Sequence, residues 1–75
     1  MTAIYDVIEK NGSDASGTVA IDPRDLAEIN AHFGTKAVDF ATAGHCGDEY
    51  SFFDRNGACV LVIGINTKLT RAAGL

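Results

Sequence analysis

Residues 49–65 constrain the fold most, because they read as a β-hairpin rich in aromatic and β-branched residues. The segment 54–57, DRNG, separates the two arms and is typical of a turn. We favour a three-residue loop, a type I turn followed by Gly57 in the left-handed conformation, with a two-residue Asn-Gly turn as the alternative. The favoured loop sets Phe53 opposite Cys59, and the alternative shifts every cross-strand pair by one residue.

In the favoured register both faces of the hairpin are apolar. One face carries Tyr50, Phe52, Val60 and Val62, and the other carries Phe53, Cys59, Leu61, Ile63 and Ile65. An antiparallel sheet with one wet face should instead alternate apolar and polar residues. We therefore expect each face to be covered, by a helix, by the C-terminal segment or by another chain.

The N-terminal third of the chain predicts a second hairpin. Residues 3–9 alternate in hydrophobicity and read as a strand, and residues 18–21 read as a short partner strand. The loop between them is dense in Gly, Ser, Asn and Asp, which favour turns. The two strands together form an N-terminal hairpin over residues 3–21.

One helix follows this hairpin. Asp22 before Pro23 predicts a helix start in which the Asp22 carboxylate caps the free N–H groups and Pro23 occupies the first helical position. The apolar stripe of the helix consists of Leu26, Ile29 and Phe33. Gly34 ends the helix in the left-handed conformation.

The sequence predicts a single α+β domain over residues 1–75 with the element order β-β-α-β-β-β. A third strand at 36–42 and the turn 43–48 lead into the central hairpin. The antiparallel sheet of four to five strands packs against one main helix. A short C-terminal helix over 67–73, capped by Asn66 or Thr67, is expected unless this segment extends the last strand.

The charges are unevenly spread along the chain. The 75 residues carry a net charge of −4, with a pI near 4.8. Residues 1–54 hold all ten acids against three basic residues, which gives −7, whereas residues 55–75 hold three basic residues and no acid, which gives +3. The overall charge argues against direct binding to nucleic acid or to an anionic membrane. With no basic leader and no apolar run of signal-peptide length, a cytoplasmic protein is expected.

Two adjacent residues, His45 and Cys46, form the most reactive cluster in the sequence. Neighbouring strand residues point to opposite faces, so His45 is poorly placed to activate the Cys46 thiol. The spacing of His32, His45, Cys46 and Cys59 matches no zinc pattern. We expect no enzymatic activity, no metal and no cofactor.

In layout, this small acidic β-β-α-β-β-β chain resembles small anti-CRISPR proteins of phages and mobile elements. The resemblance covers the hairpin 3–21, the helix 23–33 and the strands within 38–65 as size and order of elements, without a shared motif. It implies that the chain inhibits a nucleic-acid-handling effector by binding it. No site residue can be carried over, because none is matched.

The leading functional hypothesis is a non-enzymatic interaction protein whose exposed acids mimic a phosphate backbone and occupy a basic groove of a protein partner. The candidate binding residues are Asp6, Glu9, Asp25, Glu28, Asp39, Asp48 and Glu49, with Asp14 in the wider pool. The same acids also read as ordinary solubilising charges.

Two other hypotheses stay open. The chain is a structural homo-oligomer subunit, a homodimer that associates through an apolar sheet face or through the edge strand. Alternatively, it is a small cysteine-dependent enzyme that uses Cys46 and His45.

Overall fold

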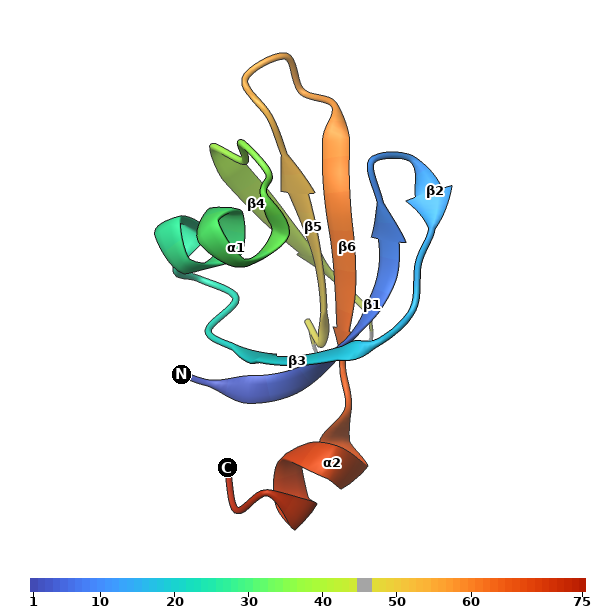
Figure 1. Cartoon of the computed structure of the whole chain (residues 1–75), viewed down its shortest axis with the longest axis vertical. Helices are drawn as coiled ribbons and strands as arrows, with labels where there is room; N and C mark the ends of the chain where they lie inside the picture. Colours follow the sequence, from blue (N-terminus) through green and yellow to red (C-terminus); the bar gives the residue numbers. More distant parts are fainter. Residues whose placement is uncertain (45–46) are drawn as a thin grey trace.

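The computed structural model describes residues 1–44 and 47–75, which form an antiparallel sheet and two helices (Figure 1). The strands are β1 (Ala3–Lys10), β2 (Ser13–Asp14), β3 (Thr18–Ile21), β4 (Asp39–Ala43), β5 (Glu49–Phe53) and β6 (Cys59–Ile65). The helices are α1 (Leu26–Phe33) and α2 (Thr67–Ala72). The α+β fold class and the order of the elements are confirmed, with the two-residue β2 as an additional strand.

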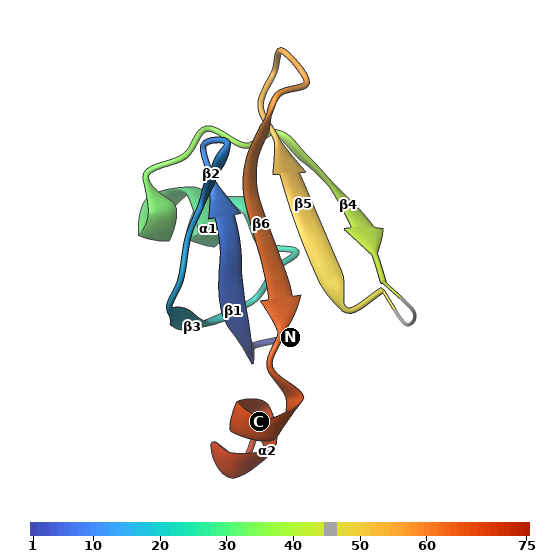
Figure 2. The same cartoon turned by 90° about the vertical axis from the view of Figure 1, so that its right-hand side faces the viewer.

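The sheet has the order β2-β1-β6-β5-β4, and β3 pairs with β1 beside β2. The N-terminal hairpin therefore lies at one edge of the sheet, and β4 forms the opposite edge. The chain passes from the first edge to the second through α1, which places this helix on one face. Figure 2 shows the strands with α1 behind them and α2 beyond the end of the sheet. We call the side of the sheet away from α1 the open face.

The turn of the central hairpin has the predicted three-residue loop. The Gly57 N–H donates to the Asp54 carbonyl at 3.0 Å, and Gly57 has a φ of 78°. Phe53 lies opposite Cys59, as the favoured register requires. The Asp54 carboxylate accepts from the N–H groups of Asn56 and Ala58, at 2.9 and 3.0 Å, which holds the loop in this shape.

Beyond Phe53 the predicted register is wrong, because a β-bulge shifts the pairing by one residue. Phe52 lies opposite Leu61 and Tyr50 opposite Ile63, so the residue after Cys59 is extra. The bulge brings the largest apolar side chains of both arms to one face. The hairpin thus has one strongly apolar face, and the prediction of two comparable apolar faces is wrong.

The core lies between this apolar face and α1. Its buried members are Ala3, Tyr5, Val19, Ile21, Ile29, Ala37, Tyr50, Phe52, Leu61 and Ile63. Ile29 is the buried residue of α1 and is fully covered, as are Phe52, Leu61 and Ile63. Burial raises the pKa of the Tyr5 hydroxyl, and the Tyr5 ring meets that of Tyr50 edge-to-face at 6.0 Å.

The start of α1 differs from the prediction. Asp25, not Asp22, is the N-cap, and its carboxylate accepts from the Glu28 N–H at 3.0 Å. Asp22 instead closes the preceding turn, because its carboxylate accepts from the Arg24 N–H at 3.1 Å and from the Met1 ammonium at 2.9 Å. Both aspartates have a carboxylate that can cap a helix. The Asp22 carboxylate is already bonded within the preceding turn, so Asp25 caps α1. At the other end Gly34 has the predicted left-handed conformation, with a φ of 68°.

The link between α1 and β4 depends on one amide side chain. Asn30 donates to the Ala37 carbonyl and accepts from the Ala37 N–H, at 2.9 and 2.8 Å, and it also accepts from the Thr35 hydroxyl. This link occupies residues predicted as strand, so β4 begins at Asp39 rather than at residue 36. Val38, the last residue of this link, is 57% exposed.

The predicted C-terminal helix is present as α2, with Asn66 as its N-cap. It continues the position of β6 beside β1. The Asn66 N–H donates to the Ile4 carbonyl at 2.8 Å, and the Thr70 hydroxyl accepts from the Ile4 N–H at 2.9 Å. The cap and the helix thereby satisfy the backbone N–H and carbonyl of Ile4 in β1 and leave the open face free.

Candidate functional site: the open face of the sheet

The open face presents the residues that alternate with the core residues along each strand. Asp6 lies next to the buried Tyr5, and Glu49 lies next to the buried Tyr50. Both carboxylates are therefore on the open face, where each residue is half-buried. No helix of the described chain lies over this side of the sheet (Figure 2).

One cross-strand row on this face joins the two acids through a glycine. Gly64 of β6 is the partner of Asp6 on β1 and of Glu49 on β5. Adjacent strands are about 4.8 Å apart, so the two acidic residues are separated by about 10 Å across Gly64. Because Gly64 has no side chain, the row has a gap at its centre.

This gap is part of a surface hollow of about 230 Å³, which we call the Gly64 hollow. Its lining consists of Asp6, Ile8, Asp48, Glu49, Gly64 and Ile65. A Cβ atom on Gly64 would lie 3.1 Å from Cδ1 of Ile8, so the isoleucine covers one side of the gap closely. The hollow thus combines three acidic residues with the hydrocarbon surface of Ile8, whereas the Ile65 side chain packs against the core.

The carboxylates of the hollow have no basic side chain beside them in the described residues. Within residues 1–44 and 47–75, the one ion pair closer than 4.0 Å joins Met1 and Asp22, and neither residue lines the hollow. Asp6 is nevertheless held in place, because the Asn66 amide donates to both of its carboxylate oxygens, at 3.1 and 3.4 Å. The hollow is thus negatively charged and partly preorganised.

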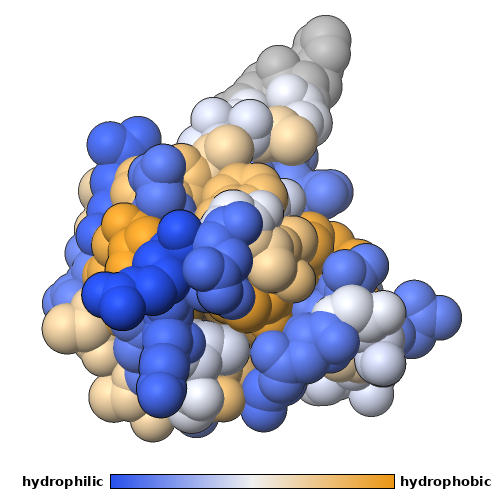
Figure 3. Space-filling view, turned by 90° about the horizontal axis from the view of Figure 1, so that it is seen from above, coloured by the Kyte–Doolittle hydropathy of each residue, from blue (hydrophilic) through white to orange (hydrophobic). Residues whose placement is uncertain are grey.

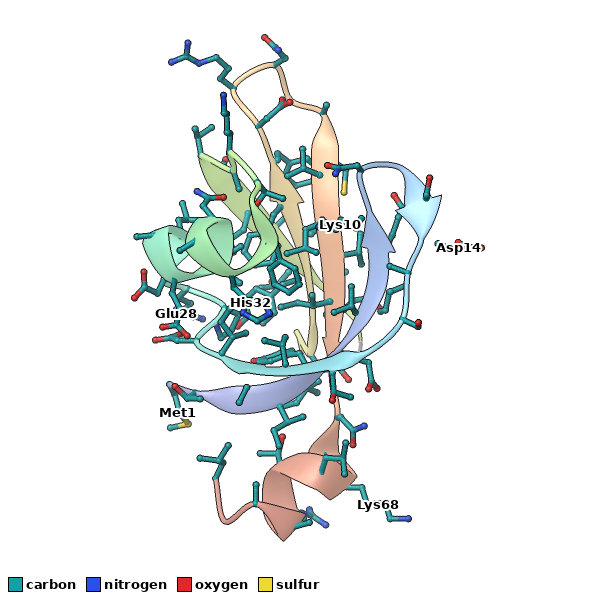
Figure 4. All side chains as sticks on the ribbon, viewed as in Figure 1. Met1, Lys10, Asp14, Glu28, His32 and Lys68 are labelled. Carbon is teal, nitrogen blue, oxygen red and sulfur yellow. The ribbon has the colours of Figure 1, made fainter. Side chains whose placement is uncertain are left out.

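The other predicted acids fall into two groups. Glu9 is the partner of Val62 and Asp39 is the partner of Phe53, so both extend the acidic character of the open face beyond the hollow. Asp25 and Glu28 belong to the start of α1, on the other side of the sheet, and Figure 4 shows Glu28 there. The structure therefore brings five of the seven predicted residues to one side and separates two from them.

A second hollow, of about 470 Å³, lies at the end of the molecule that carries the β5–β6 turn. Its lining consists of Lys36, Val38, Asp54, Arg55 and Asn56. In Figure 3, which views the molecule from above, hydrophilic residues surround apolar surface that stays visible between them. The two basic residues make this hollow different in charge from the Gly64 hollow.

Of the residues considered for cysteine chemistry or zinc binding, the structure describes His32 and Cys59. His45 and Cys46 lie outside the described residues. Cys59 is half-buried, and its Sγ lies 3.8 Å from the Leu61 carbonyl oxygen. Among the residues that the structure describes, no three His, Cys, Asp or Glu side chains are grouped closely enough to hold a metal ion.

Sequence reasoning missed Gly64 and Ile8 as parts of the site. A signal for Gly64 was present, since an isolated glycine within an apolar strand often marks a bulge or a close approach. Ile8 read as a regular member of an alternating strand. The register of β1 on β6 shifts between Val7 and Glu9, which leaves Ile8 unpaired beside the hollow.

Comparison with known proteins adds no relative. No protein-family model, no curated protein and no solved structure matches the chain. In the described residues no helix is long and apolar enough to cross a membrane.

Proposed function

We propose that this chain is a small, acidic, non-enzymatic interaction protein that binds a nucleic-acid-handling effector through its acidic surface. In this role it resembles the anti-CRISPR inhibitors of phages and mobile elements, and it acts in the cytoplasm. The observation that carries the proposal is the Asp6–Gly64–Glu49 row, whose carboxylates lie on a sheet face that no helix of the described chain covers.

The physical basis of the proposal is charge complementarity. Proteins that handle nucleic acids carry basic grooves, which attract any surface with suitably spaced negative charge. The open face offers the carboxylates of Asp6, Glu49 and Glu9 on a rigid sheet, with Asp48 at its end. A rigid acidic surface competes with the phosphate backbone without being a substrate, which is what an inhibitor of such an effector needs.

A phage-infection assay tests the proposal. We would express the chain in bacterial strains with active CRISPR immunity of several types and measure plaque formation by a phage that the immunity targets. Inhibition of an effector restores plaque formation in the susceptible strain. The effector recovered with the tagged chain should then be released by added nucleic acid, because both occupy the same basic groove.

Two single charge reversals provide a matched control. Glu49→Lys changes the open face, whereas Glu28→Lys makes the same change in net charge on the exposed surface of α1. We expect the first variant to lose inhibition and the second to keep it. Unchanged immunity in every strain, together with a captured partner that nucleic acid does not displace, would contradict the proposal.

A second candidate function is self-association through the edge strand β4. Ala41, Thr42 and Ala43 are exposed along this edge, and alternate residues of an unpaired edge present free backbone groups. Two open faces, by contrast, would bring like charges together in a face-to-face dimer. The edge is therefore the favoured route to a homodimer, and it leaves the open face available to a partner.

A further inference from the structure

The shape of the Gly64 hollow, and not only its acidity, indicates which kind of chemical group can fill it. Its carboxylates stand on both sides of a gap rather than converging on one point. At about 230 Å³ it is much larger than the space that a single water molecule needs. The hollow is thus large enough for the head of a long side chain.

The lining also favours one chemistry over others. Ile8 supplies apolar surface, which suits the hydrocarbon stem of a long basic side chain. Asp6 and Glu49 supply acceptors on opposite sides of the gap. A planar guanidinium has donors on several edges and can engage acceptors on two sides, whereas a lysine ammonium is a point charge.

We propose that the Gly64 hollow is a socket for an arginine side chain on the surface of a protein partner. The guanidinium lies between the carboxylates of Asp6 and Glu49, and the stem packs on Ile8. The remaining apolar surface of the open face, at Val62 and Phe53, then contacts the partner around the inserted arginine. This inference rests on the proposed function, because it names the group of the partner that the open face recognises.

Gly64 is the residue on which the socket depends, and it can be changed without straining the backbone. Its φ lies outside the left-handed region, so an L-residue meets no backbone strain there, and the one close neighbour is the flexible end of Ile8, which has to shift slightly. A larger side chain at this position fills the gap from below. The charge of the chain stays the same, which separates the effect of shape from that of electrostatics.

The experiment is a titration of the labelled chain with acetyl-Ala-Arg-Ala-amide, followed by the backbone amide signals in NMR spectra. The citrulline peptide, which has the same shape without the charge, is the first control, and the lysine peptide is the second. We expect saturable shifts at the amides of Asp6, Glu49 and Gly64 with the arginine peptide, weaker shifts with lysine and none with citrulline.

Variants of the chain make the test specific. Gly64→Leu should raise the Kd for the arginine peptide at least about tenfold, because the side chain occupies the socket. Glu49→Gln should raise it about two- to fivefold, as expected for a partly exposed ion pair, and Glu28→Gln should leave it unchanged. If Gly64→Leu does not fold, Glu49→Gln against Glu28→Gln still decides the question.

Several results would overturn the socket. One is a set of NMR shifts on addition of the arginine peptide that are as large at Asp25 and Glu28 as at the residues of the open face. Another is binding that survives both Gly64→Leu and Glu49→Gln. Shifts at the hollow that grow with the concentration of the chain alone would identify a second copy as the occupant, and would also contradict the inference.

The socket and the proposed function can fail separately. Arginine-peptide binding at Gly64 without any inhibition of an effector would support the socket and contradict the inhibitor. Inhibition that Gly64→Leu leaves intact, and that Glu49→Gln also leaves intact, would support the inhibitor and contradict the socket.

Discussion

The Asn66 side chain bonds Asp6 and caps α2 at the same time. Its amide nitrogen lies 3.1 Å from Oδ1 of Asp6, and its carbonyl oxygen accepts from the Leu69 N–H at 2.9 Å. One side chain thus couples a carboxylate of the open face to the start of the C-terminal helix. Because Asp6 has this role in the fold, Glu49 is the cleaner position for tests of binding.

Replacing Asn66 should loosen α2. Asn66→Ala removes the cap and the bond to Asp6, and we expect it to destabilise the helix by about 0.5–2 kcal/mol. Asn66→Ser keeps a capping oxygen without the amide donor, so the difference between Asn66→Ser and the parent chain reports on the Asp6 contact, and the difference between the two variants reports on the cap. Hydrogen exchange of the α2 amides measures both. Exchange rates equal to those of the parent chain in both variants would contradict the coupling.

The two neighbouring phenylalanines of β5 should differ sharply in their effect on stability. Phe52 is fully buried, so Phe52→Ala should cost about 3–5 kcal/mol, enough to threaten a chain of this size. Phe53 is half-buried on the open face, and Phe53→Ala should cost about 1 kcal/mol. Denaturant unfolding measures both values. Equal losses of stability, or a larger loss for Phe53→Ala, would show that the bulge does not place Phe52 in the core and Phe53 on the open face.

The same bulge explains how far the sequence could predict this fold. The DRNG segment predicts the turn and the Phe53–Cys59 pair, because turn residues act through local backbone chemistry. Beyond that pair, a run of consecutive apolar residues in β6 has no alternation from which a one-residue shift can be read. The identity of the core face, and with it the position of the open face, depends on that shift.

Other parts of the site could be predicted from the sequence to different degrees. Asp25 and Glu28 sit on a predicted helix and Asp6 on a predicted strand, so their separation into two layers follows from the predicted elements. The Asp6–Gly64–Glu49 row could not be predicted, because it needs the register of three strands at once. The choice of Asp25 over Asp22 as the cap depends on the contacts of Asp22 with Met1 and Arg24.

The Asp22 carboxylate should respond to the state of the amino terminus. Its hydrogen bond with the Met1 ammonium, and then that with the Arg24 N–H, hold the pKa of Asp22 below its usual value of 3.8. A lowered pKa in the folded state contributes stability above the usual value, which is lost as the pH falls through the lowered one.

Acetylation of the Met1 amino group in the 75-residue chain should therefore raise the pKa of Asp22. An NMR titration of the Asp22 carboxyl group measures the change, and Asp22→Asn shows which signal belongs to it. A pKa that acetylation does not move would show that the contact with Met1 is absent in solution.

The Asn30 side chain should be essential for the link between α1 and β4. Ala37 is 5% exposed, and both of its backbone polar groups bond to Asn30. Asn30→Ala leaves an N–H and a carbonyl buried without partners, at about 1–3 kcal/mol for each group. Asn30→Asp keeps the acceptor but loses the donor, so it should be intermediate. Denaturant unfolding of the three chains checks this order, and a fully stable Asn30→Ala variant would contradict it.

Self-association, if it uses the free edge of β4, should be blocked by a single proline at the right position. The Phe40 N–H bonds to the Asp39 carboxylate at 2.8 Å rather than to β5. Because hydrogen-bonded and free positions alternate along an edge strand, the N–H of Thr42 also points away from the sheet. Proline has no N–H and is tolerated where that group faces solvent. Thr42→Pro should therefore keep the fold and prevent pairing of two β4 edges.

Sedimentation over a wide dilution series measures the outcome. We expect the parent chain to form a dimer at high micromolar concentration and Thr42→Pro to remain a monomer. Ala41→Pro is the matched control within the fold, because Ala41 is the partner of Ser51 on β5 and proline there removes a bond of the sheet itself. That variant should have a lower free energy of unfolding than the parent chain, and it should lose association only where it unfolds. A parent chain that is monomeric at every concentration would rule out the dimer, and a dimer that persists in Thr42→Pro would move the contact away from β4.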